Sequence, residues 1–268
     1  MPAPGPRRKS ATPAPKFQVL LDFDGTLVEP NVAIELVGEF APDGPRIAHE
    51  VDLELHAGKI TLREAWAREV EILPMDRISE MREYTVRNVP LRKGAHELLD
   101  LLQEHGIPFA IVSGGLDFYI RPVLDREGVR APIFCDTVVA DEEGETPHLA
   151  HPYGHPTCRL CGICKARVVR DHAKDQVPVV FVGDGSTDRF AAEVADVVFA
   201  RHRLLTYCRE RGIPHLPFED LHPVRETMAR WIGGEEVIPR RGALGVRASK
   251  CPISQELSER SEEVRGRG

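Results

Sequence analysis

Two carboxylates on alternate residues, Asp22 and Asp24, are the first groups in the chain that are placed for chemistry. They follow the apolar residues 19–21, which are typical of a buried parallel strand, and they precede Gly25 and the hydroxyl of Thr26. In an extended chain alternate side chains point to the same side, so both carboxylates could reach one cation or one phosphoryl group. Gly25 would let the chain turn and bring backbone N–H groups close to an anion. The alternative is an Asx-type turn, in which the carboxylates only cap the backbone.

The same pattern, an apolar run that ends in small and polar residues, occurs twice more. Residues 107–112 end in Ser-Gly-Gly at 113–115, and residues 177–182 end in Gly-Asp-Gly-Ser-Thr-Asp at 183–188. In open α/β sheets ligands bind beyond the carboxyl ends of the strands, so we expect these distant endings to converge on one site. Lys165 opens the helix-like stretch before the third run and would add a cation to that site.

These motifs resemble those of the haloacid dehalogenase superfamily phosphatases. Residues 22–26 are similar to the first motif of that family, Ser113 to the second, Lys165 to the third and residues 183–188 to the fourth, in the same order. The resemblance covers residues 17–230. It implies an α/β fold with a Rossmann-like, doubly wound parallel sheet and a small helical cap inserted after the first strand.

The resemblance also implies a mechanism for cleaving phosphate esters. Asp22 is interpreted as the nucleophile that forms an aspartyl-phosphate, and Asp24 as the acid that protonates the leaving alkoxide and then the base that activates water. Two negative charges at about 4 Å and an effective dielectric constant near 20 repel by roughly 4 kcal/mol, so a cation is needed. We expect Mg²⁺, held by Asp22, the backbone carbonyl of Asp24, Asp184 and waters, because this oxygen-rich shell suits a hard cation.

The remaining motif residues are interpreted as binding groups for the substrate. Ser113 and the Gly114 N–H would hold phosphoryl oxygens, and Asp188 would orient Lys165 or a metal-bound water. A phosphomutase or phosphotransferase would use the same intermediate and pass the phosphoryl group to a hydroxyl, so this alternative stays open. A binding protein without activity is disfavoured because no motif is degraded.

The stretch between the first two motifs has helical rather than strand periodicity. Asn31 and Thr61 are candidate N-caps, and Glu64 stands three residues after Thr61 in a capping-box arrangement. An insert at this position resembles the cap that closes over the site in the family and selects the substrate. The expected organisation is a disordered leader (1–16), a core (17–30 and 90–232) that includes a hairpin and cysteine-rich flap (135–164), a helical cap (31–89) and a charged, solvated tail (233–268).

Three cysteines, Cys158, Cys161 and Cys164, are each separated by two residues in the loop before the lysine. With His155 they could form a structural Zn²⁺ site. Zinc usually takes ligands from two separate segments, so free or redox-labile thiols in a tight turn are the favoured interpretation. An iron–sulfur cluster is disfavoured because Val168 occupies the position at which a ferredoxin-type run carries its fourth cysteine.

This cysteine-rich approach to the lysine narrows the resemblance. It is similar to the same stretch in 2-hydroxy-3-keto-5-methylthiopentenyl-1-phosphate phosphatases, the enol-phosphate phosphatases of methionine salvage. A similar segment occurs in phosphoethanolamine/phosphocholine phosphatases, whereas phosphoserine phosphatases share the four motifs but not this segment. The implied substrate is a small phosphorylated metabolite, with the methylthiopentenyl enol-phosphate first and the phosphorylated amino alcohols or phosphoserine as alternatives.

The composition argues against several classes of protein. A formal charge of −7 over 268 residues disfavours a general affinity for nucleic acid or an anionic membrane. The chain has no apolar run that is long enough to span a bilayer, which predicts no membrane partner. Six cysteines without a signal peptide indicate a reducing cytoplasm. A homodimer is expected from the resemblance alone.

Overall fold

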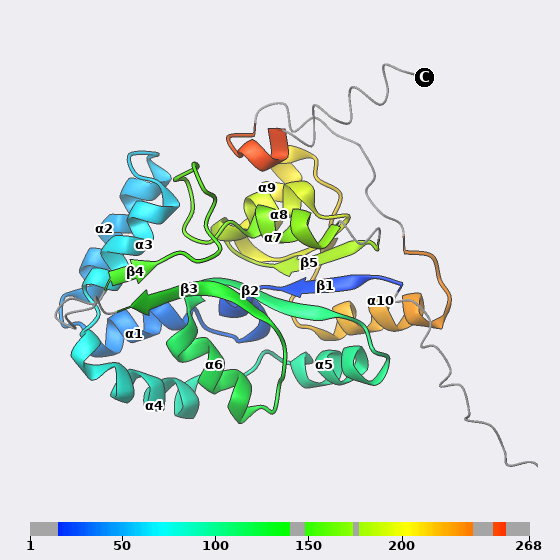
Figure 1. Cartoon of the computed structure of the whole chain (residues 1–268), viewed down its shortest axis with the longest axis horizontal. Coiled ribbons are helices and arrows are strands. Elements are labelled where there is room, and N and C mark those ends of the chain that lie inside the picture. The colour runs from blue at the N-terminus through cyan, green and yellow to red at the C-terminus, as the bar shows by residue number, and fades with distance from the viewer. Residues whose placement is uncertain (1–15, 140–147, 174–176, 238–248, 256–268) are drawn as a thin grey trace, which may run out of the picture.

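A single sheet forms the centre of the molecule (Figure 1). The computed structural model describes residues 16–139, 148–173, 177–237 and 249–255. The strands lie in the order β4-β3-β2-β1-β5-β6-β7, and every neighbouring pair is parallel except the antiparallel pair β3 and β4. The strands are β1 Gln18–Leu21, β2 Phe109–Leu116, β3 Ile133–Val139, β4 His148–Ala150, β5 Val179–Gly183, β6 Val197–Ala200 and β7 Leu216–Pro217. The predicted doubly wound α/β fold is confirmed.

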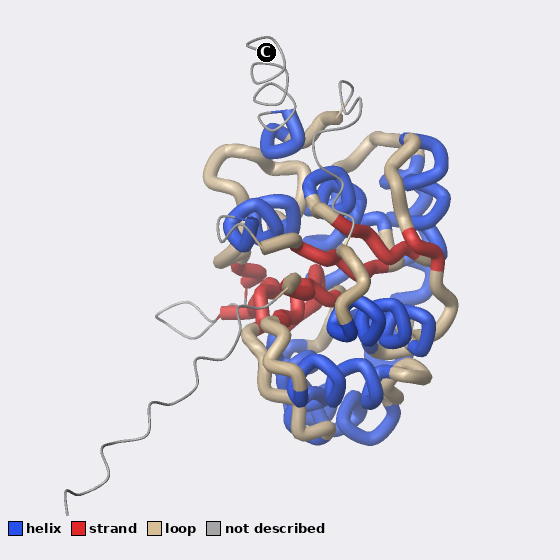
Figure 2. The backbone as a smooth tube through the Cα atoms, turned by 90° about the vertical axis from the view of Figure 1, so that its right-hand side faces the viewer, coloured by secondary structure: helices blue, strands red, loops and turns tan. Residues whose placement is uncertain are grey.

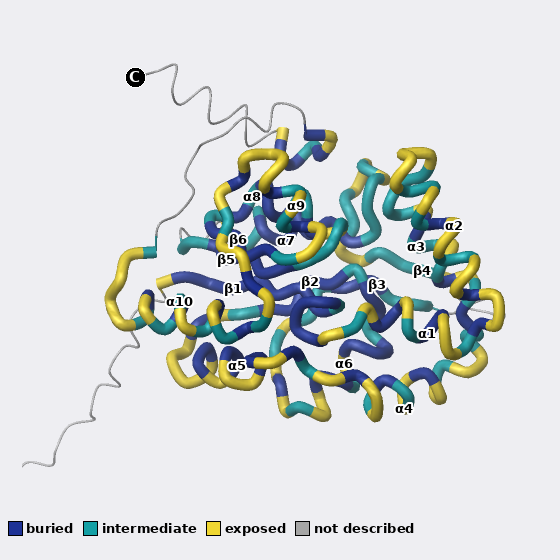
Figure 3. Tube along the Cα trace, turned by 180° about the vertical axis from the view of Figure 1, so that it is seen from behind, coloured by how far each residue is buried: buried dark blue, intermediate teal, exposed yellow. Residues whose placement is uncertain are grey.

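Helices cover both faces of the sheet, as Figures 1 and 2 show. One layer contains α5 (Ala95–Glu104), α6 (Asp117–Arg126) and α10 (His222–Gly233), and the other contains α7 (Lys165–His172), α8 (Arg189–Val194) and α9 (His202–Arg211). The buried strand β1 serves both layers, because Val19 and Leu21 pack into one apolar cluster and Leu20 into the other. Alternation of side chains along the strand thus produces the two cores, and Figure 3 shows the sheet buried between them.

Residues 31–89 contain helices and no strand, and they lie together at one end of the sheet (Figure 1). An antiparallel bridge between Val28 and Leu91 joins the two ends of this insert to each other. Its helices are α1 (Val32–Phe40), α2 (Gly44–His56), α3 (Leu62–Glu71) and α4 (Ile78–Asn88).

Both predicted N-caps of the insert are present. The Asn31 side chain accepts a hydrogen bond from the Ile34 N–H at 3.2 Å. Thr61 and Glu64 form a complete capping box, in which the backbone N–H of each residue donates to the side chain of the other. In the part of the chain that the structure describes, no helix has the length and the apolar character to cross a membrane.

The sequence interpretation was wrong about two strands. β2 does not end at residue 112 but continues to Leu116, with a shift of register between Val112 and Leu116. β3 is not only part of a rim hairpin, because Ile133 and Phe134 pair in parallel with β2. The buried Asp136 interrupts the apolar pattern that would have identified this strand. The hairpin itself is present between β3 and β4, and its acidic turn around residue 144 lies outside the described residues.

The segment 249–255 differs from the expected solvated tail. Ser249, Cys251, Ile253 and Ser254 are all buried. The serine hydroxyls both donate to one oxygen of the buried Glu193 carboxylate at 2.6 Å, which attaches the segment to α8. Residues 1–15, 238–248 and 256–268 of the predicted leader and tail lie outside the described residues.

Candidate active site

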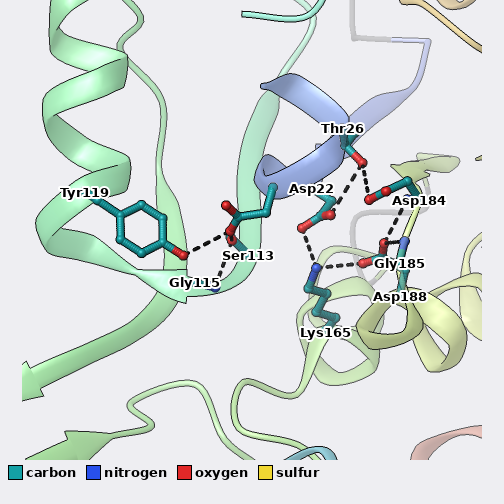
Figure 4. A network of polar contacts seen from close by, with 10 residues as sticks. Asp22, Thr26, Ser113, Gly115, Tyr119, Lys165, Asp184, Gly185 and Asp188 are labelled. Carbon is teal, nitrogen blue, oxygen red and sulfur yellow. Dashed lines mark hydrogen bonds and ion pairs between the residues drawn. The ribbon is translucent and has the colours of Figure 1, made fainter. Parts of the chain in front are cut away.

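The carboxyl ends of β1, β2 and β5 bring the predicted site residues together (Figure 4). Asp22 follows β1 directly, Ser113 lies near the end of β2, and Asp184 follows β5. Lys165, the first residue of α7, reaches the same place from the side. Asp22 and Lys165 are more than 140 positions apart in the sequence, and the fold brings them into direct contact.

Lys165 bridges two carboxylates. Its Nζ lies 2.5 Å from Asp22 Oδ1 and 2.6 Å from Asp188 Oδ1, and all three side chains are at most 5% exposed. Burial, then the charge of Asp188, raises the pKa of Asp22 well above its usual value, although Lys165 acts in the opposite direction. Burial alone would lower the pKa of Lys165, but the two carboxylates outweigh it and raise that pKa. The ammonium group therefore stays charged, and the group of side chains still carries excess negative charge.

The excess charge is concentrated on three carboxylates. Asp22, Asp184 and Asp188 each offer one oxygen, and these oxygens lie within 4.8 Å of one another. Burial, then the charge of Asp188, raises the pKa of Asp184 to about 6. Thr26 Oγ1 lies 3.2 Å from Asp184 Oδ1 and 3.4 Å from Asp22 Oδ2. This set of hard oxygen donors fits Mg²⁺, with Asp188 in addition to the aspartates expected from the sequence.

Gly25 is required beside this cluster. Its φ of +71° lies in the left-handed region, and a Cβ at this position would come within 2.5 Å of Asp184 Oδ2. The turn that carries Gly25 is held by two arginines that the sequence analysis missed. Arg92 donates to the carbonyls of Gly25 and Thr26 at 2.8 and 2.9 Å, and Arg201 donates to the Gly25 carbonyl at 2.7 Å. No sequence signal connects either arginine to this turn.

Asp24, the other carboxylate of the first motif, makes a separate set of contacts. Its Oδ1 accepts a hydrogen bond from the Val32 N–H at 2.9 Å, at the start of α1. Its Oδ2 accepts from the Tyr119 hydroxyl at 3.0 Å and from Ser113 Oγ at 3.4 Å. Burial raises the pKa of Asp24 to about 6, although these donors stabilise its ionised form. Such a carboxyl group can both give and take a proton near neutral pH.

Tyr119 is a site residue that the sequence analysis missed. Its ring is fully buried, and its hydroxyl donates to Asp24 Oδ2. Gly115 leaves the space for this contact, because a Cβ there would overlap the tyrosine hydroxyl and come within 2.7 Å of Asp24 Oδ2. The position of Tyr119 in the first turn of a helix after the Ser-Gly-Gly loop was a usable signal for this role.

The predicted binding residues occupy different environments. Ser113 is fully buried, and its Oγ accepts from the Gly115 N–H at 3.0 Å besides contacting Asp24. Gly114 lines the open cavity above the carboxylates. Asp188 Oδ2 accepts from the backbone N–H groups of residues 184 and 185 at 3.0 and 2.9 Å, while its other oxygen contacts the lysine. Asp188 therefore orients both the lysine and the loop after β5.

A cavity of about 790 Å³ extends from the carboxylates to the helical insert. Asp22, Asp24 and Asp184 lie at one end. The wall that α1, α2 and α3 contribute is largely apolar and includes Ile34, Val37, Ala48, Leu55, Leu62 and Trp66.

Polar groups interrupt the apolar wall, among them His49 and Asp52 of α2. The Trp66 Nε1 is buried and has no hydrogen-bond partner among the described residues. Glu69 also lines the cavity, and burial, with a smaller contribution from the charge of Asp52, raises its pKa to about 7. The insert therefore places a readily protonated carboxyl group in the wall of the cavity.

The structure does not bring together the four residues considered for a zinc site, His155, Cys158, Cys161 and Cys164. His155 Nδ1 accepts a hydrogen bond from the Cys158 N–H at 3.0 Å, so this nitrogen is turned toward the loop backbone. Among the described residues, no three donor atoms from His155 and the cysteines lie within 4.8 Å of one another. The close grouping that a zinc ion imposes on its ligands is therefore absent from this set of four.

Comparisons with known proteins agree with the fold and with the motifs. Residues 19–193 match the haloacid dehalogenase-like hydrolase family. A Bacillus velezensis protein named 2-hydroxy-3-keto-5-methylthiopentenyl-1-phosphate phosphatase is 33% identical over 211 residues, which are 77% of this chain and 87% of the relative. A relative of the same name from Exiguobacterium sp. is 34% identical over 212 residues, 78% of this chain and 96% of the relative.

Solved structures give the same fold. A substrate-bound phosphoserine phosphatase complex superimposes with a TM-score of 0.61 and 20% identity, over 79% of this chain and 98% of the other. A hydrolase of the same family from Salmonella enterica gives a TM-score of 0.63 at 18% identity, over 83% and 73% of the two chains. The chain therefore belongs to the haloacid dehalogenase-like hydrolases and is a phosphoric monoester hydrolase.

Proposed function

We propose that this enzyme is a Mg²⁺-dependent phosphatase that works through an aspartyl-phosphate, and that its substrate is 2-hydroxy-3-keto-5-methylthiopentenyl-1-phosphate in methionine salvage. The observation that carries this proposal is the cavity with two chemically different ends. One end holds the carboxylates for a phosphoryl group and its cation, among them Asp22, which is paired with Lys165, and the other is an apolar wall for the remainder of the substrate. The named relatives support the same substrate.

Mg²⁺ would be held by the carboxylates of Asp22 and Asp184 together with the backbone carbonyl of Asp24, and Asp188 lies close enough to contribute. When bound, it would neutralise the negative charge of the phosphoryl group and of the attacking carboxylate. Lys165 already keeps Asp22 oriented and supplies one positive charge to it. Together they offset the repulsion between two anions that would otherwise prevent the attack.

The chemical steps are assigned to the two motif carboxylates. An oxygen of Asp22 forms a bond to phosphorus while the bond from phosphorus to the ester oxygen breaks, and Asp24 gives its proton to that leaving oxygen. In the second half, Asp24 takes a proton from a water molecule whose oxygen attacks phosphorus. The bond between phosphorus and Asp22 then breaks and phosphate leaves. The pKa of about 6 for Asp24 supports this double role, because both of its protonation states are populated near neutral pH.

The apolar wall favours a substrate with an apolar end. A methylthio group would be removed from water among side chains such as Ile34 and Leu62. Trp66 adds an aromatic side chain to this wall. A phosphorylated amino alcohol would instead need an anionic partner in this wall, where Asp52 is already paired with Arg203 at 3.2 Å and burial raises the pKa of Glu69 to about 7.

The test is phosphate release with Mg²⁺ across a panel of substrates. The panel contains the methylthiopentenyl enol-phosphate, phosphoserine, phosphoethanolamine, phosphocholine and pyridoxal phosphate. We expect the highest kcat/KM with the enol-phosphate. A preference for an amino-alcohol phosphate would refute the substrate and leave the mechanism intact. Transfer of phosphate to an alcohol acceptor without release would instead favour the phosphotransferase, and Asp22→Asn should abolish both activities.

Trp66→Phe tests the substrate contact separately. The change removes part of the apolar surface of the wall and keeps an aromatic ring, so kcat/KM for the enol-phosphate should fall by about three- to tenfold through lost apolar contact. A small phosphate monoester that does not reach the wall should be hydrolysed at an unchanged rate. Trp231→Phe is the matched control, since this tryptophan packs against Phe17 in the core and does not line the cavity. Equal losses with both substrates would argue against the contact.

A further inference from the structure

The structure brings a fourth cysteine to the cysteine-rich loop. Cys251 comes from the segment 249–255 and lies against Cys164 in a small buried apolar cluster. A second cavity is lined by all four sulfur-bearing residues, Cys158, Cys161, Cys164 and Cys251.

The position of Cys251 is built into the fold. Its backbone N–H donates to Ser249 Oγ at 3.1 Å, and Ser249 and Ser254 both donate to the buried carboxylate of Glu193. Ile253, two residues further on, is fully buried. The segment is therefore held on both sides of Cys251, which keeps its side chain next to the cysteine-rich loop.

We propose that Cys158, Cys161, Cys164 and Cys251 are the four thiolate ligands of a metal centre and that its occupant is a [4Fe–4S] cluster. A C-x₂-C-x₂-C run combined with one further Cys-Pro pair is the ligand pattern of such clusters in ferredoxins. Here the loop supplies the run, and Cys251 with Pro252 supplies the pair. The cysteine that was missing at position 168 is thus replaced by one from a distant segment.

The separation of the sulfur atoms favours a cluster over a single zinc ion. Thiolates bound to one zinc at about 2.3 Å lie about 3.8 Å apart in a tetrahedron. Among the described residues, no three of the cysteine sulfurs lie within 4.8 Å of one another. A cluster places four irons between its thiolates and so holds them farther apart than one ion does. Three ligands from one short run also differ from zinc sites, which typically take two ligands from each of two segments.

The surroundings of the sulfurs suit a buried anionic cluster. Leu160, Phe190 and Ile253 line the cavity with apolar groups, and the charge of Arg189 acts on Cys161.

The proposed centre lies beside the active site. Cys164 directly precedes Lys165, which also lines the second cavity. The same loop reaches the helical insert, where the Arg63 N–H donates to the Leu160 carbonyl at 3.3 Å. A cluster would therefore fix the loop that positions the lysine and contacts α3.

The test uses the full chain, produced with added iron and purified without oxygen. Iron, acid-labile sulfide and zinc are quantified per chain, and the visible absorption of sulfide-to-iron charge transfer is recorded. We expect about four iron and about four sulfide per chain. Cys251→Ser should lose both, and Cys208→Ser, at a buried cysteine of α9 away from the cavity, should retain both.

A second variant keeps the proposal falsifiable if Cys251→Ser fails to fold. Cys158 is only half-buried, so Cys158→Ser should fold normally, as judged by circular dichroism, and still lose the iron and sulfide. One zinc per chain in place of iron would overturn the cluster as the occupant. Absence of both metals, or a metal content that neither Cys251→Ser nor Cys158→Ser changes, would overturn the four-thiolate centre itself.

Discussion

Replacement of Asp184 by asparagine should make the metal-free protein more stable while it destroys activity. Asp184 shares a small volume with Asp22 and Asp188, and Lys165 supplies a positive charge in direct contact with the latter two. Asparagine keeps the shape of the side chain and an oxygen that can accept from Thr26, but it removes one negative charge. The variant should therefore relieve repulsion in the empty site and weaken the site for Mg²⁺.

The size of this effect follows from the pKa of Asp184. The pKa is about 6 in the folded protein, compared with its usual 3.8, so the folded state binds more protons than the unfolded state between these values. The free energy of unfolding therefore decreases as the pH rises from about 4 to about 6, by about 3 kcal/mol for this group. Asparagine does not titrate, so the variant avoids this decrease. Its free energy of unfolding should exceed that of the natural sequence by up to about 3 kcal/mol at pH 8 and by little at pH 4.

Urea unfolding at pH 8 and pH 4, with a chelator and then with Mg²⁺, measures this. With the chelator, Asp184→Asn should unfold at higher urea than the natural sequence at pH 8 only. Added Mg²⁺ should stabilise the natural sequence, because it binds the folded state, and have a much smaller effect on the variant. Asp125→Asn, the same change at an exposed residue of α6, should leave the midpoint unchanged at either pH. Equal destabilisation of Asp184→Asn at both pH values would refute the reasoning.

Three further substitutions test the packing and the charges around the site. Gly115→Ala should lower kcat/KM by about tenfold or more with an unchanged circular dichroism spectrum, because its methyl group would overlap the Tyr119 hydroxyl beside Asp24; full activity would contradict this close approach. Lys165→Met should lower the free energy of unfolding in urea by about 3–5 kcal/mol, since it leaves buried carboxylates without their partner; an unchanged midpoint would show that the ion pairs contribute nothing. Thr61→Ala should cost about 1 kcal/mol in the same assay through loss of the capping box of α3, and no change would mean that the box is not formed in solution.

Local patterns were sufficient to predict the sheet and the approximate place of the site. The apolar run of β1 and the valines of β5 identify buried strands without knowledge of their neighbours. Asp22 and Asp184 directly follow those strands. Because the carboxyl ends of parallel strands share one edge of an open α/β sheet, the two residues are expected to lie close together. The capping box at Thr61 was equally local, because both partners lie within one turn.

Local patterns failed where a polar residue is buried by distant parts of the chain. Asp136 lies inside β3, and its Oδ1 lies 3.0 Å from Nδ1 of His151, a contact that the pattern of β3 alone does not reveal. The segment 249–255 has the composition of a tail, but Glu193 binds its serines. In both cases a buried polar group lies beside a polar residue from another segment, and that neighbour cannot be identified from adjacent positions in the sequence.

The sequence by itself therefore determined which residues stand at the strand ends, since strand periodicity and motif spacing act over a few residues. Only the tertiary structure decided which side chains meet there. The contact of Asp24 with Tyr119 joins residues 95 positions apart, and Cys251 approaches Cys164 from a segment beyond the last core helix. Such contacts depend on how helices pack against the sheet and on the rotamers that this packing allows, and a one-dimensional pattern contains neither.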